Sequence, residues 1–149
     1  MCLGASLFVA TAWGFNNDGQ TDILWRNYNT GENAVWLMNG ATYVSSTPLP
    51  MVSDLDWKMV GTGDFNNDGQ LDILWRHATT GQNAVWYMNG SAYLSSATLQ
   101  SISDTNWEIV GTGYFNADGN IDLLWRNRVT GDNAIWFMNG KEGLCCRRR

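Results

Sequence analysis

The sequence predicts an all-β protein built from three four-stranded repeats of 50 residues. Near-copies of the segment from Phe65 to Arg76 lie 50 residues before it and 50 residues after it. Around these segments, short runs of apolar, β-branched and aromatic residues are separated by Asn, Asp and Gly, as in strands joined by tight turns. Such a repeat means that each unit needs its neighbours to bury its apolar surface.

The composition is that of a folded, acidic chain. Hydrophobic residues make up 44% of the 149 residues, and nine are Trp, which is ample for a packed core. The net charge is −5 and there is no basic patch, which argues against nucleic acid as a partner and is compatible with cation binding. No apolar run approaches the roughly 18–20 residues that span a bilayer. Cys2, Cys145 and Cys146 lie outside the repeated motifs, so no disulfide framework is expected.

We expect one repeat domain over residues 1–149, with repeats at about 7–50, 57–100 and 107–149. Residues 141–149 are predicted to be an atypical tail, because they share nothing evident with the fourth strand of the middle repeat. Residues 1–12 allow two interpretations. They are either a short signal peptide that lacks a basic start, or a diverged first strand.

The middle repeat predicts its elements most clearly. The expected strands are residues 57–65, 72–77, 83–88 and 91–99. Asn89-Gly90 is a strong hairpin signal between the last two, since both residues tolerate positive φ. Four short antiparallel strands in about 50 residues match one blade of a β-propeller.

Both faces of these strands are apolar. Ile73 and Trp75 point to one side of the second strand, while Leu74 and Arg76 point to the other. This pattern suits a sheet that is packed between two others. A β-trefoil is the alternative fold: it explains three repeats better, but the two-sided strands worse. Three blades are fewer than the four or more usual in a closed ring, so either copies associate or the chain is part of a longer propeller.

The loop between the first two strands of the middle repeat has the pattern of a calcium site. Oxygen-bearing side chains occupy loop positions 1, 3, 5 and 9, and Gly69 at position 6 permits the sharp bend. Calcium takes about six to eight oxygen ligands, and position 7 can add a backbone carbonyl. The candidate ligands are Asp64, Asn66, Asp68, Gln70 and Asp72.

The outer loops keep only part of this pattern. Position 1 is Gly14 in the first loop and Tyr114 in the third, so each lacks one anionic ligand and we expect weaker binding. Their candidate ligands are Asn16, Asp18, Gln20 and Asp22, and Asn116, Asp118, Asn120 and Asp122. In every loop the alternative is a plain turn, in which Asn and Asp bond to their own backbone.

The segment Asp64-Phe65-Asn66-Asn67-Asp68-Gly69-Gln70-Leu71-Asp72-Ile73-Leu74 resembles the FG-GAP/VCBS-type repeat of integrin-alpha-like propellers. The Trp-Arg, Thr-Gly and Asn-Ala-Val-Trp-x-Met-Asn-Gly elements that follow resemble the bacterial version, and the similarity covers roughly residues 13–140. It implies calcium-stabilised blades with ligands at the five positions of the middle loop. It also implies an extracellular or cell-surface setting and a role in adhesion or carbohydrate recognition. Such rings usually have seven blades, from which the length of this chain departs.

The remaining conspicuous side chains have structural interpretations. The Trp residues are expected to pack between blades, although aromatic faces also stack on sugars. Arg26, Arg76 and Arg126 are expected to pair with carboxylates or to cover apolar surface with their stems. His77 stands where the other repeats have Asn27 and Asn127, and is expected in a turn.

No catalytic constellation is evident, so we do not expect an enzyme. Three functions remain: a calcium-stabilised, non-enzymatic binding or cell-adhesion module, a carbohydrate-binding lectin, and a structural fragment of a larger propeller. The expected partners are calcium and either carbohydrate or a cell-surface protein, with a homo-oligomer or a longer propeller as the assembly.

Overall fold

A computed structural model describes the backbone of residues 5–9, 14–139 and 142–148, and the side chains of residues 14–139. The first sheet contains β1 (Ala5–Val9), β2 (Ile23–Asn27), β3 (Asn33–Asn39) and β4 (Thr42–Leu49). The second contains β5 (Trp57–Gly63), β6 (Asp72–His77), β7 (Asn83–Asn89) and β8 (Ala92–Leu99). The third contains β9 (Trp107–Gly113), β10 (Asp122–Asn127), β11 (Asn133–Asn139) and β12 (Glu142–Arg148). No helix that could cross a membrane occurs in these parts of the chain.

The prediction of an all-β chain with three four-stranded repeats is confirmed. In each sheet the strands follow one another in sequence order and pair antiparallel with their neighbours. Among the described strands, pairing stays within each repeat, which does not fit a trefoil, where strands of different repeats close a barrel.

The two ends of the chain also contain strands. Residues 5–9 pair with β2, in line with the diverged first strand, and the segment predicted as an atypical tail pairs with β11 as β12. Backbone hydrogen bonds need no particular side-chain pattern, so β12 forms without resembling β8. The signal-peptide interpretation of residues 1–4 and 10–12, and the side chains of the three cysteines, lie outside the described residues.

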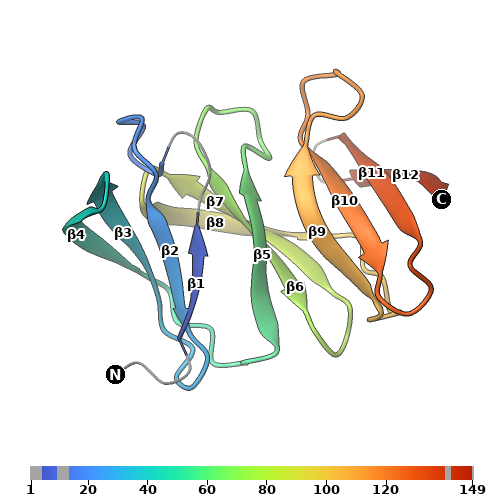
Figure 1. The fold of residues 1–149 in the computed structure, drawn as a ribbon, viewed down its shortest axis with the longest axis horizontal. Helices are drawn as coiled ribbons and strands as arrows, with labels where there is room; N and C mark the ends of the chain where they lie inside the picture. The colour runs from blue at the N-terminus through green and yellow to red at the C-terminus, as the bar shows by residue number, and fades with distance from the viewer. Residues whose placement is uncertain (1–4, 10–13, 140–141, 149) are drawn as a thin grey trace.

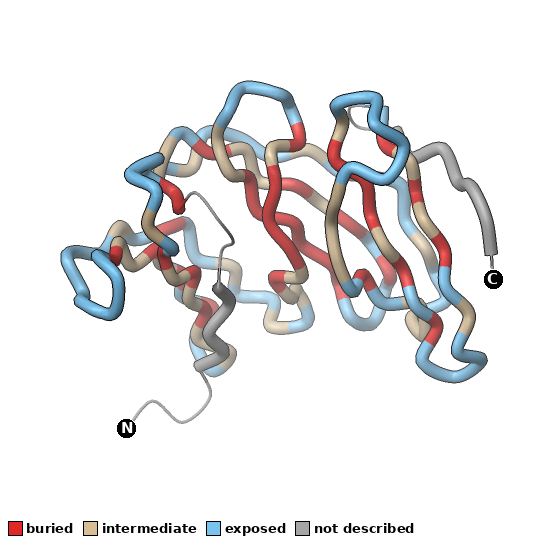
Figure 2. The backbone as a smooth tube through the Cα atoms, turned by 45° about the horizontal axis from the view of Figure 1, so that its top comes forward, coloured by how far each residue is buried: buried red, intermediate tan, exposed pale blue. Residues whose placement is uncertain are grey.

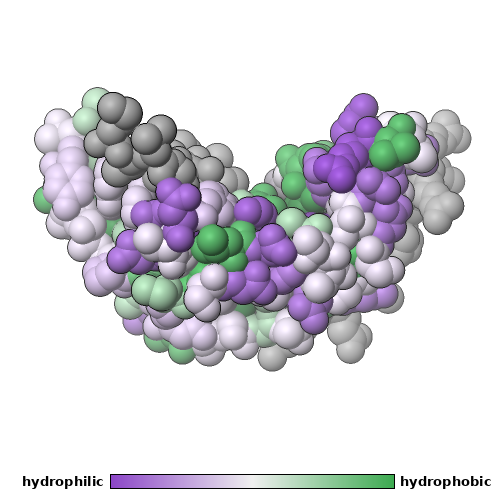
Figure 3. All heavy atoms as spheres, turned by 90° about the horizontal axis from the view of Figure 1, so that it is seen from below, coloured by the Kyte–Doolittle hydropathy of each residue, from purple (hydrophilic) through white to green (hydrophobic). Residues whose placement is uncertain are grey.

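The three sheets stand side by side (Figure 1) and form an open crescent with a hollow on one side (Figure 3). The first strands of the second and third sheets are neighbours, and the Thr112 hydroxyl on β9 donates to the Thr62 carbonyl on β5 at 3.0 Å. The glycines of β5 allow this close approach: a Cβ at Gly63 would collide with the Ile121 side chain of the third repeat.

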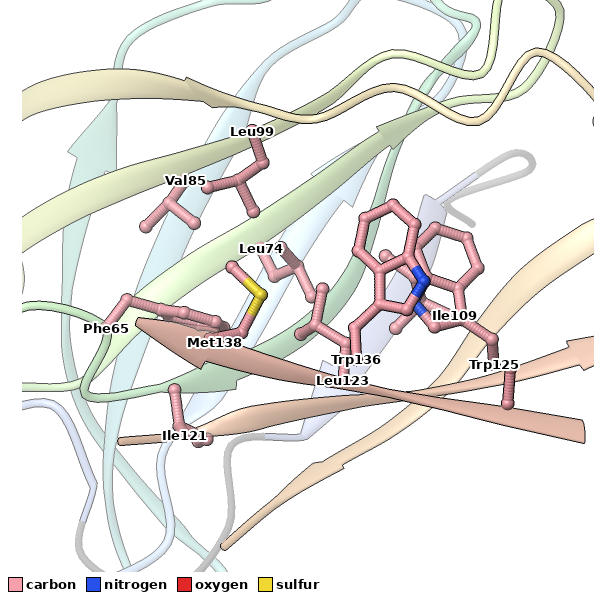
Figure 4. Packing of buried hydrophobic residues seen from close by; sticks show 11 residues of the cluster. Phe65, Leu74, Val85, Leu99, Ile109, Ile121, Leu123, Trp125, Trp136 and Met138 are labelled. Atoms are coloured by element: carbon pink, nitrogen blue, oxygen red, sulfur yellow. The ribbon is translucent and has the colours of Figure 1, made fainter. Parts of the chain in front are cut away.

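Two apolar clusters join the sheets. Figure 2 shows that the buried residues lie mainly along the strands, while the connecting loops are mainly exposed. We call the side of a sheet that faces the following repeat its forward face, and the opposite side its rear face. In the second sheet, Leu74, Val85 and Leu99 belong to the forward face. Figure 4 shows them packed with Phe65 against the rear face of the third sheet, including Leu123 and Trp125.

The same arrangement occurs one repeat earlier. Phe15 and Leu24 of the first repeat pack against the rear face of the second sheet, where Ile73 and Trp75 lie. The alternation of Ile73 and Trp75 with Leu74 therefore places apolar side chains in two different cores, as the sequence predicts.

The arginines that follow Trp25 and Trp75 each join one repeat to the next. The Arg76 guanidinium donates to the carbonyls of Gly81, Ile102 and Asp104 and to Asn83 Oδ1, at 3.0–3.5 Å. It also lies over the Trp125 ring of the third sheet, 4.9 Å from the ring centroid.

Arg26 makes the equivalent contacts in the first repeat. It bonds to the carbonyls of Val52 and Asp54 in the linker between sheets and lies over the Trp75 ring. Of the two expectations for these arginines, pairing with carboxylates is wrong, because neither ion pair among residues 14–139 involves them. Their partners are backbone carbonyls, Asn side chains and, for Arg26, also the Tyr28 side chain. Arg126 likewise donates to Asn133.

Replacing Arg76 by Leu should lower the free energy of unfolding by about 3 kcal/mol, because several buried acceptors lose their donor. Arg76→Lys should recover little of this, since an ammonium group cannot reach the linker and the turn with one planar fork. Urea unfolding followed by Trp fluorescence measures both changes. Arg128→Leu, on an exposed side chain, is the control and should stay within about 0.5 kcal/mol. Equal stabilities of the Arg76 and Arg128 variants would contradict the inter-repeat role.

Candidate functional site

In the middle loop, side-chain oxygens accept hydrogen bonds from the N–H groups of the loop itself. Asp64 accepts hydrogen bonds from the N–H groups of Asp68 and Gly69, at 3.0 and 2.8 Å. Asn66 donates to the Asp68 carboxylate at 2.9 Å, and the other oxygen of Asp68 accepts the N–H of Gln70. Four of the five predicted ligands therefore lie together in this exposed turn.

A tight left-handed bend makes this turn possible. The residue at loop position 4 has positive φ in each repeat: Asn17, Asn67 and Ala117, near +60°. Gly69 at position 6 has a φ of +82°, with no atom near the place of a Cβ. Glycine is thus required there by backbone conformation and not by space. Asn67 also joins the repeats, since its side-chain amide donates to Asn120 Oδ1 in the third loop at 3.0 Å.

The fifth predicted ligand, Asp72, lies beneath the turn at the start of β6 and is fully buried. One carboxylate oxygen accepts the Phe65 N–H at 2.9 Å, and the other accepts the Met88 N–H of β7 at 3.0 Å. Asp22 and Asp122 make the same pair of bonds in their own repeats. Position 9 thus ties the loop to the third strand in every repeat.

The pKa of Asp72 is raised to about 6, chiefly by burial and in part by the nearby carboxylates of Asp68 and Asp64, against the lowering effect of the two backbone hydrogen bonds. In the third loop, by contrast, the Asn120 N–H and the Asn116 amide hold the pKa of the exposed Asp118 below its usual value. The middle loop is therefore the place where negative charge gathers around a buried carboxylate.

The outer loops differ from the middle loop as the sequence predicts at position 1. The bonds of Asn66 and Asp68 recur at Asn16 and Asp18 and at Asn116 and Asp118. No carboxylate stands at position 1, where the residues are Gly14 and the exposed Tyr114. The side-chain oxygens of Gln20 and Gln70 accept the N–H groups of Gly40 and Gly90, the glycines that follow β3 and β7.

The donor set of the middle loop fits a calcium ion in its chemistry. It offers hard oxygen atoms only, and three carboxylates would offset the charge of a divalent cation. Neither of the two ion pairs found among residues 14–139 involves these carboxylates, so no basic side chain neutralises them. The turn hydrogen bonds described above are also those of the alternative interpretation, a plain Asx turn.

A second group of possible ligands was not predicted. Asp54, Asp56 and His77 have ligand atoms within 4.8 Å of one another, and in the described part of the chain no other three such side chains do. His77 Nε2 lies 2.9 Å from the Asp54 carboxylate, and Thr79 bonds to Asp56. His77 is far in sequence from the two aspartates and meets them only through the pairing of β5 with β6, so no local sequence motif predicts this group.

This group has a structural explanation. The expectation that His77 lies in a turn is wrong, because it is the last residue of strand β6. Its Nδ1 nevertheless lies within hydrogen-bond distance of the N–H groups of Thr79 and Thr80 in the turn that follows. Asn127 plays the same part in the third repeat: it accepts N–H groups of its turn and donates to Asp104. His77 thus makes hydrogen bonds equivalent to those of Asn127: Nδ1 accepts from the turn, and Nε2–H donates to Asp54. The hydrogen bond from His77 lowers the pKa of Asp54.

Two clefts adjoin these elements. One, of about 640 Å³, lies beside the middle loop and is lined by Asp64, Gln70, Thr112 and Tyr114, among others. The other, of about 260 Å³, lies at the rear face of the second sheet and is lined by Trp57, Trp75 and Trp86 together with Ser96 and Thr98. The first has a mixed lining of polar and apolar side chains, and the second is walled by indole rings.

From the raised pKa of Asp72 we predict how the stability of the protein depends on pH when divalent cations are removed. The folded state binds a proton at this carboxyl below about pH 6, whereas the unfolded state binds it only near the ordinary value of 3.8. This group's contribution to stability should therefore rise by roughly 1 kcal/mol as the pH falls from about 7 to about 5. Urea unfolding in chelator at both pH values measures it. The Asp72→Asn variant should lack this part of the pH dependence, and an equal dependence in both proteins would contradict the assignment.

Comparison with known families agrees with this architecture. The chain matches the family described as FG-GAP-like repeat over residues 14–75 and again over residues 64–125. Each match begins at position 1 of one Asp-rich loop and ends at the tryptophan of the second strand in the next repeat. No curated protein and no solved structure matches the chain. The two overlapping matches, together with three like sheets and their loops, show that this chain belongs to the FG-GAP-like repeat family.

Proposed function

We propose that the chain is a calcium-stabilised, non-enzymatic binding module built from propeller blades. The observation that carries this proposal is the middle loop, where the carboxylates of Asp64 and Asp68 lie near enough to the buried Asp72 to raise its pKa and form no ion pair with a basic side chain among residues 14–139. Membership of the FG-GAP-like repeat family supports it, and so do the three four-stranded sheets with apolar faces.

Calcium would act on the fold through the loop backbone. Asp64, Asn66 and Asp68 would supply side-chain oxygens, Gln70 its carbonyl, and Asp72 a carboxylate that already ties the loop to β7. A cation there would relieve the mutual repulsion of the carboxylates and would favour the charged form of Asp72. The outer loops would bind more weakly, because their first position has no carboxylate.

As a binding module, the chain would present loops and clefts on a rigid scaffold, outside the cell or on its surface, where millimolar calcium can fill such sites. The cleft of about 640 Å³ beside Asp64 is the place where a bound cation and a partner would meet. Adhesion to a cell-surface protein is the function we favour for this face.

Calcium should raise the thermal midpoint, and the middle loop should carry most of the rise. At a hundredfold excess over the Kd, ligand binding adds about 2.7 kcal/mol to the free energy of unfolding. Asp68→Ala should remove most of the shift between calcium and chelator, whereas Asp18→Ala, at the same place in the first loop, should remove little of it. Differential scanning fluorimetry and titration calorimetry measure both.

Asp56→Ala is the control for the other group of ligand atoms and should leave the calcium shift unchanged. Loss of the shift in Asp56→Ala with retention in Asp68→Ala would transfer the site to the Asp54, Asp56 and His77 group. An absent shift in the parent chain would refute calcium binding altogether.

The tryptophan-walled cleft supports a second candidate function, that of a lectin. Its indole rings offer flat apolar faces, and the hydroxyls of Ser96 and Thr98 offer polar contacts beside them. Its volume of about 260 Å³ would suit a single sugar ring better than a long ligand. Trp86 is half-buried, packed against Trp75 and Tyr93, and the exposed part of its ring is available to a ligand in the cleft.

If the cleft binds sugars, a glycan array should give a selective signal that persists at saturating calcium. Trp86→Ala should abolish that signal, because it removes a wall of the cleft. Trp36→Ala is the matched control: it changes the same position of the first sheet, whose rear face has no preceding sheet among the described residues. No signal with the parent chain, or equal loss in both variants, would count against the lectin function.

A further inference from the structure

The forward face of the third sheet has the composition of the two forward faces that are buried, but no sheet covers it within the described residues. Phe115 is 45% exposed, whereas its equivalents Phe15 and Phe65 are 1% and 6% exposed. Leu124 and Ile135 continue this face on β10 and β11, where the second sheet has the fully buried Leu74 and Val85. The third sheet thus has the same apolar forward face as the first two sheets, but no sheet packs against it among the described residues.

The polar part of this face likewise has no partner segment among the described residues. Arg126, Gly131 and Asn133 are exposed, while the corresponding residues of the first two repeats are buried. A Cβ on Gly81 would collide with the Ile102 carbonyl of the next linker, whereas one on Gly131 would meet only the Arg126 guanidinium, at 3.9 Å. The socket that receives a linker in the first two repeats is therefore formed in the third but holds none among the described residues.

The first sheet has the complementary surface. Ile23 and Trp25 on its rear face are half-buried, whereas Ile73 and Trp75 at the same positions of the second sheet are buried beneath the first. No arginine lies over Trp25 in the described residues, although Trp75 and Trp125 each have one.

The geometry of the paired indole rings also differs between the covered rear faces and the uncovered one. In the two covered pairs, Trp75 with Trp86 and Trp125 with Trp136, the ring planes are tilted by 50° at 4.8 Å. Trp25 and Trp36 instead stack at 6.4 Å, with an angle of only 11°.

We propose that a second copy of this chain docks head to tail, with its first sheet against the forward face of the third sheet. Arg126 then lies over Trp25 of the second copy, and Phe115, Leu124 and Ile135 pack against its Ile23 and Trp36. The argument for a second copy is continuity: the same two kinds of face already meet twice within the chain, between the first and second sheets and between the second and third.

Such a contact joins two different patches, so it is heterologous. Two copies form a closed ring when the free forward face of each copy packs against the free rear face of the other. Six sheets then surround the hollow that Figure 3 shows as open.

Analytical ultracentrifugation of the 149-residue chain, in calcium and in chelator, gives the first test. The expected species has twice the mass of one chain. Arg126→Glu should weaken the dimer by about a hundredfold or more, because it replaces the central cation of both junctions by an anion. Trp25→Glu should do the same from the other face, with Ile23→Lys in its place if the Trp25 variant does not unfold cooperatively. Arg128→Glu makes the same charge change two residues away and should leave the dimer intact.

Mixing the variants tests the head-to-tail arrangement itself. Arg126→Glu keeps an intact rear face and Trp25→Glu keeps an intact forward face, so the mixture has one unmodified junction for each pair of chains. A heterodimer should form in the mixture although neither variant dimerises alone, and native mass spectrometry resolves it after isotope labelling of one partner.

A monomer at concentrations up to about 100 µM would overturn the proposal. Persistence of the dimer in both single variants would overturn it as well, and so would a mixture that stays monomeric. Calcium binding is read from the thermal shift, so the dimer can fail while the proposed function stands, and the reverse.

Discussion

Every sheet of this protein carries large apolar side chains on both of its faces. β2, β6 and β10 place an aliphatic residue and an indole on one side, and a leucine and an arginine on the other, so each sheet needs a neighbour on both sides. This requirement explains the order of the fold: the sheets lie one behind another, and each core contains residues from two repeats. It also explains the Arg26 and Arg76 contacts, since a cation at the edge of such a core must satisfy its donors with backbone carbonyls and an aromatic face.

The loops depend on the same framework. Asp22, Asp72 and Asp122 are buried where a loop meets the second and third strands of its own sheet, and both oxygens of each accept backbone N–H groups. A carboxylate in this place serves the fold whether or not a cation lies above it. The features that distinguish the middle loop are added above this base, chiefly Asp64, which lies at the top of the turn.

Much of this structure follows from local sequence pattern. The alternation from Ile73 to Arg76 shows directly which side chains share a face, and Asn, Asp and Gly mark the turns, so strands and repeats are predictable. The targets of Arg76 are not predictable in this way, because backbone carbonyls of residues 102 and 104 have no signature in the sequence. The same holds for His77 and Asp54, which meet only through strand pairing, and for Asp72, whose spacing suggests a ligand but whose oxygens also hold the backbone.

The linker contacts have a mechanical consequence. The chain leaves each of the first two sheets at its fourth strand and enters the next at its first strand, and on the way it is held by the preceding turn: Val52 N–H donates to the Gly31 carbonyl, and Ile102 N–H donates to the Gly81 carbonyl. A force that separates one sheet from the next would therefore load these short crossings together with the apolar core between the sheets. The guanidinium groups of Arg26 and Arg76 bond to the crossings from the side, so such a force meets a hydrogen-bonded cross-link at each of the two boundaries between sheets.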